Sequence, residues 1–205
     1  MNADKIPDII IGRLPIYLRA LQRLANQGIT NTSSQELGEM IGISAAQIRK
    51  DISQFGEFGK QGTGYLIPFL IERLQTILKV NPVWDVIVVG IGDIGHAIAR
   101  YNGFVNRGFN VVMLFDNDLN KVGQKVNNLE IYSMDTMVER VKQNKIKVAM
   151  LTVPASYAQE VAEQLVKAGV KAILNYAPIH LNVPKDVRVQ HIDPAIHLQR
   201  MTYYL

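Results

Sequence analysis

Residues 84–95, WDVIVVGIGDIG, decide the fold of this chain, because an apolar run enters a glycine-rich turn and a helical pattern follows at once. Trp84–Val89 is rich in β-branched residues, which is typical of a strand buried in a parallel sheet. The turn has the spacing GxGxxG, and a second apolar run ends at Asp116, 21 residues beyond Gly95. Strand, turn, helix and acid in this order predict a dinucleotide-binding Rossmann unit.

Each residue of this motif has a physical role. Gly90 permits the tight turn, Gly92 lets backbone N–H groups approach a pyrophosphate at the positive end of a helix, and Gly95 lets the helix pack against the strand. Asp116 is expected to accept hydrogen bonds from ribose hydroxyls and to repel a 2′-phosphate, which favours NAD(H) over NADP(H). Asp93 is electrostatically unfavourable beside a pyrophosphate unless it faces solvent or caps the helix.

The alternation of strands and helices continues to the end of the chain. Apolar runs predict strands at 146–153, 171–175 and 187–192, a helix at 155–168, and a final amphipathic stretch at 195–205. This pattern predicts a doubly wound parallel α/β sheet. Residues 81–205 suffice for a minimal Rossmann domain and leave no length for a separate substrate domain.

The first eighty residues read instead as short helices. Apolar residues recur at helical spacing over 7–25, with Pro15 inside the pattern as a possible kink or delayed helix start. Ser33 with Glu36, and Ser44 with Gln47, have the spacing of capping boxes, which mark helix starts. Two short capped helices joined by a glycine turn predict a helix-turn-helix.

The second of these helices, 45–55, is the candidate recognition helix. Ile48, Ile52 and Phe55 form its inward face, and polar residues occupy the other faces. Such side chains suit base edges and phosphates. The expected DNA contacts on and before this helix are Ser44, Gln47, Arg49, Lys50 and Ser53, with Lys50 the first candidate for a base contact and Arg49 and Ser44 for phosphates. The alternative is an ordinary solvated helix face.

A glycine-rich segment follows, with glycines at 56, 59, 62 and 64. Its place after a recognition helix predicts the wing of a winged helix, and the alternative is a flexible connector. The aromatic residues Phe55, Phe58 and Tyr65 argue against a connector, because flexible linkers lack such anchors. The wing adds the expected DNA contacts Lys60, Gln61, Gly62 and Tyr65. Residues 68–80 then predict a helix leading into the second half.

Composition narrows the possible functions. The 205 residues include no cysteine, which excludes disulfides, thiolate nucleophiles and cysteine-ligated metals, so any redox role needs a bound cofactor. The net charge of +4 divides equally between 1–80 and 81–205, so charge alone does not identify a polyanion-binding half. We expect no metal site, no membrane segment and a cytoplasmic protein.

Along essentially its whole length the chain resembles Rex, the NADH-sensing transcriptional repressors of bacteria. The combination of RKD, then FGEFG, then a Rossmann fingerprint is specific to that family. The matching segments are RLPIYLR at 13–19, QIRKD at 47–51, FGEFG at 55–59, FD at 115–116, LTVP at 151–154, AQ at 158–159, NYAP at 175–178 and ID at 192–193.

The resemblance implies a homodimeric winged-helix repressor that is not an enzyme. It would bind an inverted-repeat operator, with each recognition helix in a major groove and each wing in a minor groove. NADH would release it from DNA, and NAD would compete without releasing it. The implied domains are a DNA-binding domain at 1–80, an NAD(H)-binding domain at 81–192 and a helix exchanged between subunits at 193–205.

The resemblance also implies a nicotinamide pocket made by Tyr101 and by Asp193 reaching across from the other subunit. As a switch, we expect Asp193 to pair with Tyr101 when NADH is bound and with Arg19 otherwise, because only NAD carries a positive nicotinamide. The complete set of expected cofactor contacts is Gly90, Gly92, Asp93, Ile94, Gly95, Asp116, Tyr101, Thr152, Val153, Pro154 and Asp193.

Three positions depart from the family pattern. The wing has Gln61 where relatives often have arginine, which predicts weaker minor-groove binding. Pro194 stands where some relatives have Leu or Phe, which leaves the contact beside nicotinamide open, and Asp93 stands where a neutral or basic residue is usual, which predicts lower cofactor affinity.

Two alternatives to a repressor remain open from the residues. A small dehydrogenase would need a proton donor beside nicotinamide. However, His96 follows Gly95 and would lie near phosphate rather than nicotinamide, and the other histidines have no obvious acid partner. Tyr157 and Lys167 lack the spacing of a catalytic pair. A Rossmann unit binding coenzyme A or another nucleotide is the other alternative, opposed by Asp116.

Overall fold

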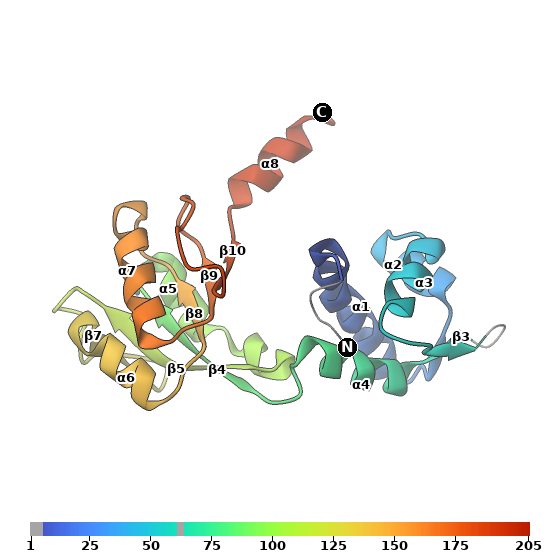
Figure 1. Ribbon diagram of the computed structural model, residues 1–205, viewed down its shortest axis with the longest axis horizontal. Coiled ribbons are helices and arrows are strands. Elements are labelled where there is room, and N and C mark those ends of the chain that lie inside the picture. Colours follow the sequence, from blue (N-terminus) through green and yellow to red (C-terminus); the bar gives the residue numbers. More distant parts are fainter. Residues whose placement is uncertain (1–5, 61–63) are drawn as a thin grey trace. The chain divides into compact units, whose positions relative to one another are not determined.

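The structure is a computed structural model that describes residues 6–60 and 64–205. The chain divides into two compact units, Met1–Pro82 and Val83–Leu205. The boundary agrees with the change from helical to alternating pattern near residue 81. Figure 1 shows the elements of both units, which are described separately below.

The first unit is built from helices and a small antiparallel sheet. The strands lie in the order β1-β3-β2, and β2 and β3 form the hairpin predicted as the wing. The elements are α1 (Asp8–Asn26), β1 (Asn31–Thr32), α2 (Ser34–Ile41), α3 (Ala45–Ser53), β2 (Gly59–Lys60), β3 (Gly64–Leu66) and α4 (Ile67–Leu78).

Local signals explain where these helices begin and end. The capping box at Ser33 is complete: its Oγ accepts from the backbone N–H of Glu36 at 3.1 Å, and Glu36 Oε2 accepts from the backbone N–H of Ser33 at 2.7 Å. At Ser44 only the first half forms, because the side chain of Gln47 is directed elsewhere. Pro15 lies inside α1, which begins at Asp8, so the proline does not delay the helix start.

The core of the first unit joins the four helices. Leu14, Tyr17 and Leu21 of α1 are fully buried, and they belong to one apolar cluster with residues of α2, α3 and α4. The recognition helix contributes Ile48 and Ile52, as predicted. It ends at Ser53, two residues before the predicted end, so Phe55 lies in the following turn and is only partly buried.

The second unit contains a seven-stranded sheet in the order β10-β9-β8-β4-β5-β7-β6. All neighbouring strands are parallel except β6 and β7, so the predicted parallel sheet has one antiparallel edge. The strands are β4 (Trp84–Val89), β5 (Phe109–Asp116), β6 (Lys125–Val126), β7 (Leu129–Ser133), β8 (Val148–Leu151), β9 (Ala172–Asn175) and β10 (Arg188–His191).

Helices cover both faces of this sheet. Along β4, Ile87 and Val89 pack in a cluster with α6 and α7, whereas Val86 and Val88 pack in a cluster with α5. This alternation is the period of two expected for a strand between two layers. The helices are α5 (Asp93–Arg100), η2 (Asn102–Arg107), η3 (Met134–Thr136), α6 (Met137–Gln143), α7 (Ala155–Ala168) and α8 (Pro194–Thr202).

The last helix, α8, differs from the other α-helices because none of its residues is buried. Asp193 caps it, with Oδ1 accepting from the backbone N–H of Ala195 at 2.9 Å. Its apolar side chains, such as Ile196, Leu198 and Met201, are more than half exposed. Among the described residues, no helix combines the length and the apolar character needed to cross a membrane.

Candidate functional site

The glycine turn between β4 and α5 has the geometry predicted for binding a pyrophosphate. Gly90 has a φ of +92°, and a Cβ there would lie 2.8 Å from Val153 Cγ1. A Cβ on Gly95 would overlap the carbonyl oxygen of Gly90. Thr152 fastens the turn to β8, since its hydroxyl donates to the carbonyl of Gly90 at 2.7 Å. Gly92, at the N-cap of α5, has no neighbouring atom within 4 Å of a Cβ, so its backbone is open to a ligand.

A cavity of about 790 Å³ opens beside this turn, at the carboxyl ends of the strands. Ligands of doubly wound sheets bind at this edge, and the volume suits a nucleotide-sized molecule. The predicted cofactor contacts that line it are Gly90, Gly92, Asp93, Ile94, Asp116, Thr152, Val153 and Pro154. Gly95 does not line the cavity, but its lack of a side chain allows α5 to pack closely against the glycine turn.

Asp116 contributes a buried carboxylate to the lining of this cavity, and only 4% of the residue is exposed. Its Oδ2 accepts from the backbone N–H of Ile91 at 2.6 Å and from Lys121 Nζ at 3.2 Å, and its Oδ1 accepts from the backbone N–H of Asp118 at 2.9 Å. Burial alone would raise the pKa of Asp116, but the hydrogen bonds from Asp118, Ile91 and Lys121 lower it below its ordinary value. The site therefore holds an ionised carboxylate tied to the glycine turn.

Several lining residues were not predicted from the sequence. Tyr176 and Pro178 belong to the NYAP segment, and that match was the signal that they lie near the cofactor. Tyr157 also lines the cavity. From the sequence, this residue was considered only as a possible catalytic partner of Lys167 in a dehydrogenase. Asp93 is exposed on the first turn of α5, which is the position that the helix dipole favours for a carboxylate.

The predicted switch residues lie outside this cavity in the described chain. Tyr101 follows α5, is 46% exposed and packs edge-on against Phe104, with ring centroids 4.9 Å apart. Asp193 caps α8, and Arg19 is exposed on α1 in the first unit. None of these three residues is among those that line the cavity.

A second polar site ties the recognition helix to α1. Asp51 of α3 is fully buried and accepts hydrogen bonds from Arg13, Tyr17 and Gln47. Burial alone would raise the pKa of Asp51, but these bonds, above all that from Arg13, lower it below its ordinary value. The pKa of Tyr17 is raised by burial and by its bond to the carboxylate. The sequence shows Asp51 only as the last residue of the QIRKD segment, and no sequence pattern indicates its partners in α1.

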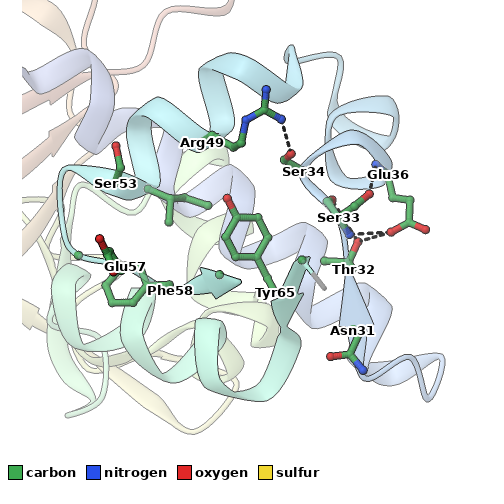
Figure 2. Close-up of a pocket in the computed structure, with 14 residues that line it drawn as sticks. Asn31, Thr32, Ser33, Ser34, Glu36, Arg49, Ser53, Glu57, Phe58 and Tyr65 are labelled. Carbon is green, nitrogen blue, oxygen red and sulfur yellow. Dashed lines mark hydrogen bonds between the residues drawn. The ribbon is translucent and has the colours of Figure 1, made fainter. Parts of the chain in front are cut away.

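Four of the five DNA contacts predicted on and before α3 have exposed side chains. Ser44, Arg49, Lys50 and Ser53 are exposed, whereas Gln47 is half-buried beside Asp51. A hollow of about 910 Å³ is bounded by the start of α2, by α3 and by the wing. Figure 2 shows the residues that line it. There Arg49 Nη1 donates to Ser34 Oγ at 2.8 Å.

The four DNA contacts predicted in the wing differ in their positions. Tyr65 is only 7% exposed, and its ring points into the space between β3 and α3 (Figure 2), so it supports the wing from beneath. Burial raises the pKa of its hydroxyl. Lys60 lies in β2, and the predicted contacts Gln61 and Gly62 fall outside the described residues. No cluster of three or more potential metal ligands occurs among the residues that the structure describes.

These features define a class of protein, in which a winged helix-turn-helix unit is followed by a Rossmann unit with an open cavity beside its glycine turn. Two family models match accordingly, "Putative DNA-binding protein N-terminus" over residues 5–53 and "CoA binding domain" over residues 81–179.

Relatives over the full length are more specific. A "Redox-sensing transcriptional repressor Rex" of Chloroflexus aggregans is 52% identical over 100% of this chain and 96% of its own. That of Carboxydothermus hydrogenoformans is 45% identical over 99% of this chain and 98% of its own. The chain belongs to the Rex family of redox-sensing transcriptional repressors. The family consists of repressors, so the dehydrogenase alternative is set aside.

Solved structures agree with this assignment. The repressor RSP in complex with β-NAD⁺ and operator DNA is 37% identical, with a TM-score of 0.92 over 97% of this chain and 92% of its own. RSP in complex with β-NADH is 35% identical, with a TM-score of 0.89 over 98% of this chain and 94% of its own.

Proposed function

We propose that this protein is a cytoplasmic, homodimeric repressor that binds an inverted-repeat operator and leaves it when NADH binds. The observation that carries the proposal is the open glycine turn joined to the ionised Asp116, on a chain that also has a winged helix. The structures of RSP with β-NADH, and with β-NAD⁺ and operator DNA, support both halves of the proposal.

On the cofactor side, the backbone at Gly92 and the start of α5 would bind the pyrophosphate. Asp116 Oδ1 accepts from the backbone N–H of Asp118 and has a further lone pair that can accept from a ribose hydroxyl. Its charge opposes a 2′-phosphate, which favours NADH over NADPH. Thr152, Val153 and Pro154 line the same cavity, and we assign them to contacts with the bound cofactor.

On the DNA side, Gln47 and Lys50 lie in the first two turns of α3, the part of a recognition helix that meets base edges. We assign the exposed residues Ser44, Arg49 and Ser53 to phosphate contacts. The wing, with Lys60, Gln61 and Gly62, is assigned to the adjacent minor groove, and Tyr65 to holding the wing in place.

The helix α8 supports dimer formation. Its apolar side chains are exposed in the single chain, and a large exposed apolar surface is typical of a protein–protein interface. In the proposed dimer, Asp193 of the partner subunit pairs with Tyr101 when NADH is bound and with Arg19 when it is not. The positive nicotinamide of NAD and the neutral ring of NADH would give that carboxylate different interactions in the two states.

The test is fluorescence anisotropy of a labelled inverted-repeat operator, titrated separately with NADH, NAD and NADPH. Release by NADH at concentrations where NAD and NADPH leave the complex intact is the expected result. Tight DNA binding that NADH does not alter would contradict the sensing function. Release by NADPH at the same concentration as NADH would contradict the role of Asp116.

A further inference from the structure

The side-chain amide of Gln47 donates a hydrogen bond to the buried carboxylate of Asp51, one turn further along α3. Gln47 Nε2 donates to Asp51 Oδ1 at 2.6 Å. Arg13 Nη2 donates to the same oxygen at 2.8 Å, and Arg13 Nε and the hydroxyl of Tyr17 donate to Oδ2 at 2.5 and 2.6 Å. Asp51 thus receives four hydrogen bonds, from α1 and from its own helix.

The chemistry of this carboxylate fixes which end of the amide faces it. An ionised carboxylate has acceptors only, whereas an amide has a donating NH₂ and an accepting oxygen. The adjacent guanidinium keeps Asp51 ionised, and the pKa of Asp51 is lowered accordingly. Gln47 must therefore turn its NH₂ inward. Its Oε1 is the end that is left to meet another molecule.

The position of Gln47 makes this orientation relevant to DNA. It is the third residue of α3, and Lys50 is three residues further on, so both lie on one side of the helix. Residues near the N-terminus of a recognition helix contact base edges. Lys50 offers only donors, whereas Gln47 offers Oε1 as an acceptor. In the major groove, adenine N6 and cytosine N4 are donors, and guanine O6 and thymine O4 are acceptors.

We propose that Asp51 is a positioning residue that makes Gln47 select an amino base, adenine or cytosine, at one position of each operator half-site. A keto base at that position would place its oxygen against Oε1 and would be disfavoured. This inference rests on the proposed function, because it presupposes that α3 enters the major groove.

The test is selection of bound sites from a randomised duplex library by the full-length protein without NADH, followed by sequencing. We expect the wild type to enrich an inverted repeat in which one position per half-site favours adenine or cytosine over guanine or thymine by about tenfold. Gln47→Met, which keeps the length but removes both polar ends, should lose that preference and retain the others. Gln27→Met, an exposed residue after α1, is the control and should leave every preference unchanged.

Asp51→Asn tests the positioning role directly. The new amide can donate to Gln47 Oε1, so the glutamine can turn and the preference should fall to about twofold. If this variant does not fold, as judged by its far-ultraviolet circular dichroism, the Gln47→Met selection still decides the assignment of Gln47.

Three results distinguish a failure of this inference from a failure of the proposed function. A Gln47→Met site identical to the wild-type site, or a wild-type preference for guanine or thymine at the affected position, overturns the assignment of Gln47. A folded Asp51→Asn variant with an undiminished amino preference overturns the role of Asp51. A wild type that enriches no inverted repeat overturns the proposed function, and this inference with it.

Discussion

Replacing Asp116 with asparagine should destabilise the second unit far more than its single lost charge suggests. Asp116 is almost fully buried and accepts from two backbone N–H groups and one lysine. Asparagine has one accepting oxygen, so its NH₂ must face one of the two backbone donors. A hydrogen bond to a charged group contributes about 1.5–3 kcal/mol, and an unsatisfied buried donor adds to the loss. We expect the free energy of unfolding to fall by about 3 kcal/mol.

The assay is urea denaturation followed by the fluorescence of Trp84, the only tryptophan in the sequence. Trp84 begins β4, the strand that enters the turn held by Asp116. With a urea dependence of about 1–3 kcal/mol per molar, a loss of about 3 kcal/mol lowers the midpoint by about 1–3 M. Asp186→Asn is the matched control in the same unit, because Asp186 pairs with Lys171 at 2.5 Å but has a side chain 65% exposed. Its midpoint should hardly move.

The pH dependence gives a second readout of the same carboxylate. The pKa of Asp116 is lower in the folded state than in the unfolded chain. Its contribution to stability is therefore present above the unfolded value of about 4 and is lost as the pH falls through the folded value. The wild type should lose stability below about pH 4 more steeply than Asp116→Asn. Equal midpoint shifts for the Asp116 and Asp186 variants would refute this reasoning.

Three further predictions concern the other parts of the molecule. Gly95→Ala should abolish NADH binding in a fluorescence titration, because its Cβ would overlap the preceding turn, whereas Gly12→Ala, with open space around its Cβ, should bind NADH normally. Tyr17→Phe removes one donor from Asp51 and should lower the unfolding free energy of the first unit by about 1 kcal/mol, measured by circular dichroism; no change would argue against the network. Asp193→Asn should abolish the difference between NADH and NAD in operator release, and an unaltered NADH response would contradict the proposed switch.

The parts of the structure that sequence reasoning predicted well are those with short-range physical causes. Gly90 has a positive φ, and a Cβ on Gly95 would overlap the carbonyl oxygen of Gly90 five residues earlier, so the glycine spacing predicted the turn that lies beside the cavity. The capping box at Ser33 is likewise a contact over three residues. For α3 the apolar spacing extended the prediction to Phe55, but the helix ends at Ser53 because the following glycine-rich segment bends the chain toward the wing.

The parts that were missed depend on short elements or on distant contacts. The hairpin of β6 and β7 adds an antiparallel edge, but β6 has two residues, which is too short to give a periodic pattern. The helix α6, with seven residues, was missed for the same reason. Asp51 meets Arg13 across 38 positions of the sequence, so no local spacing shows that its charge is paired.

Because α8 buries no residue against its own chain, the response of this repressor should depend on protein concentration. A helix of nine residues is marginal in water unless tertiary packing stabilises it, and α8 buries none of its residues against its own chain. In the proposed dimer the second copy would cover α8 and stabilise it, and the stability of that arrangement would follow mass action. A cell that makes little of this protein would hold a larger fraction with an unformed α8. Expression level and nicotinamide redox state would therefore set the occupancy of the operator together.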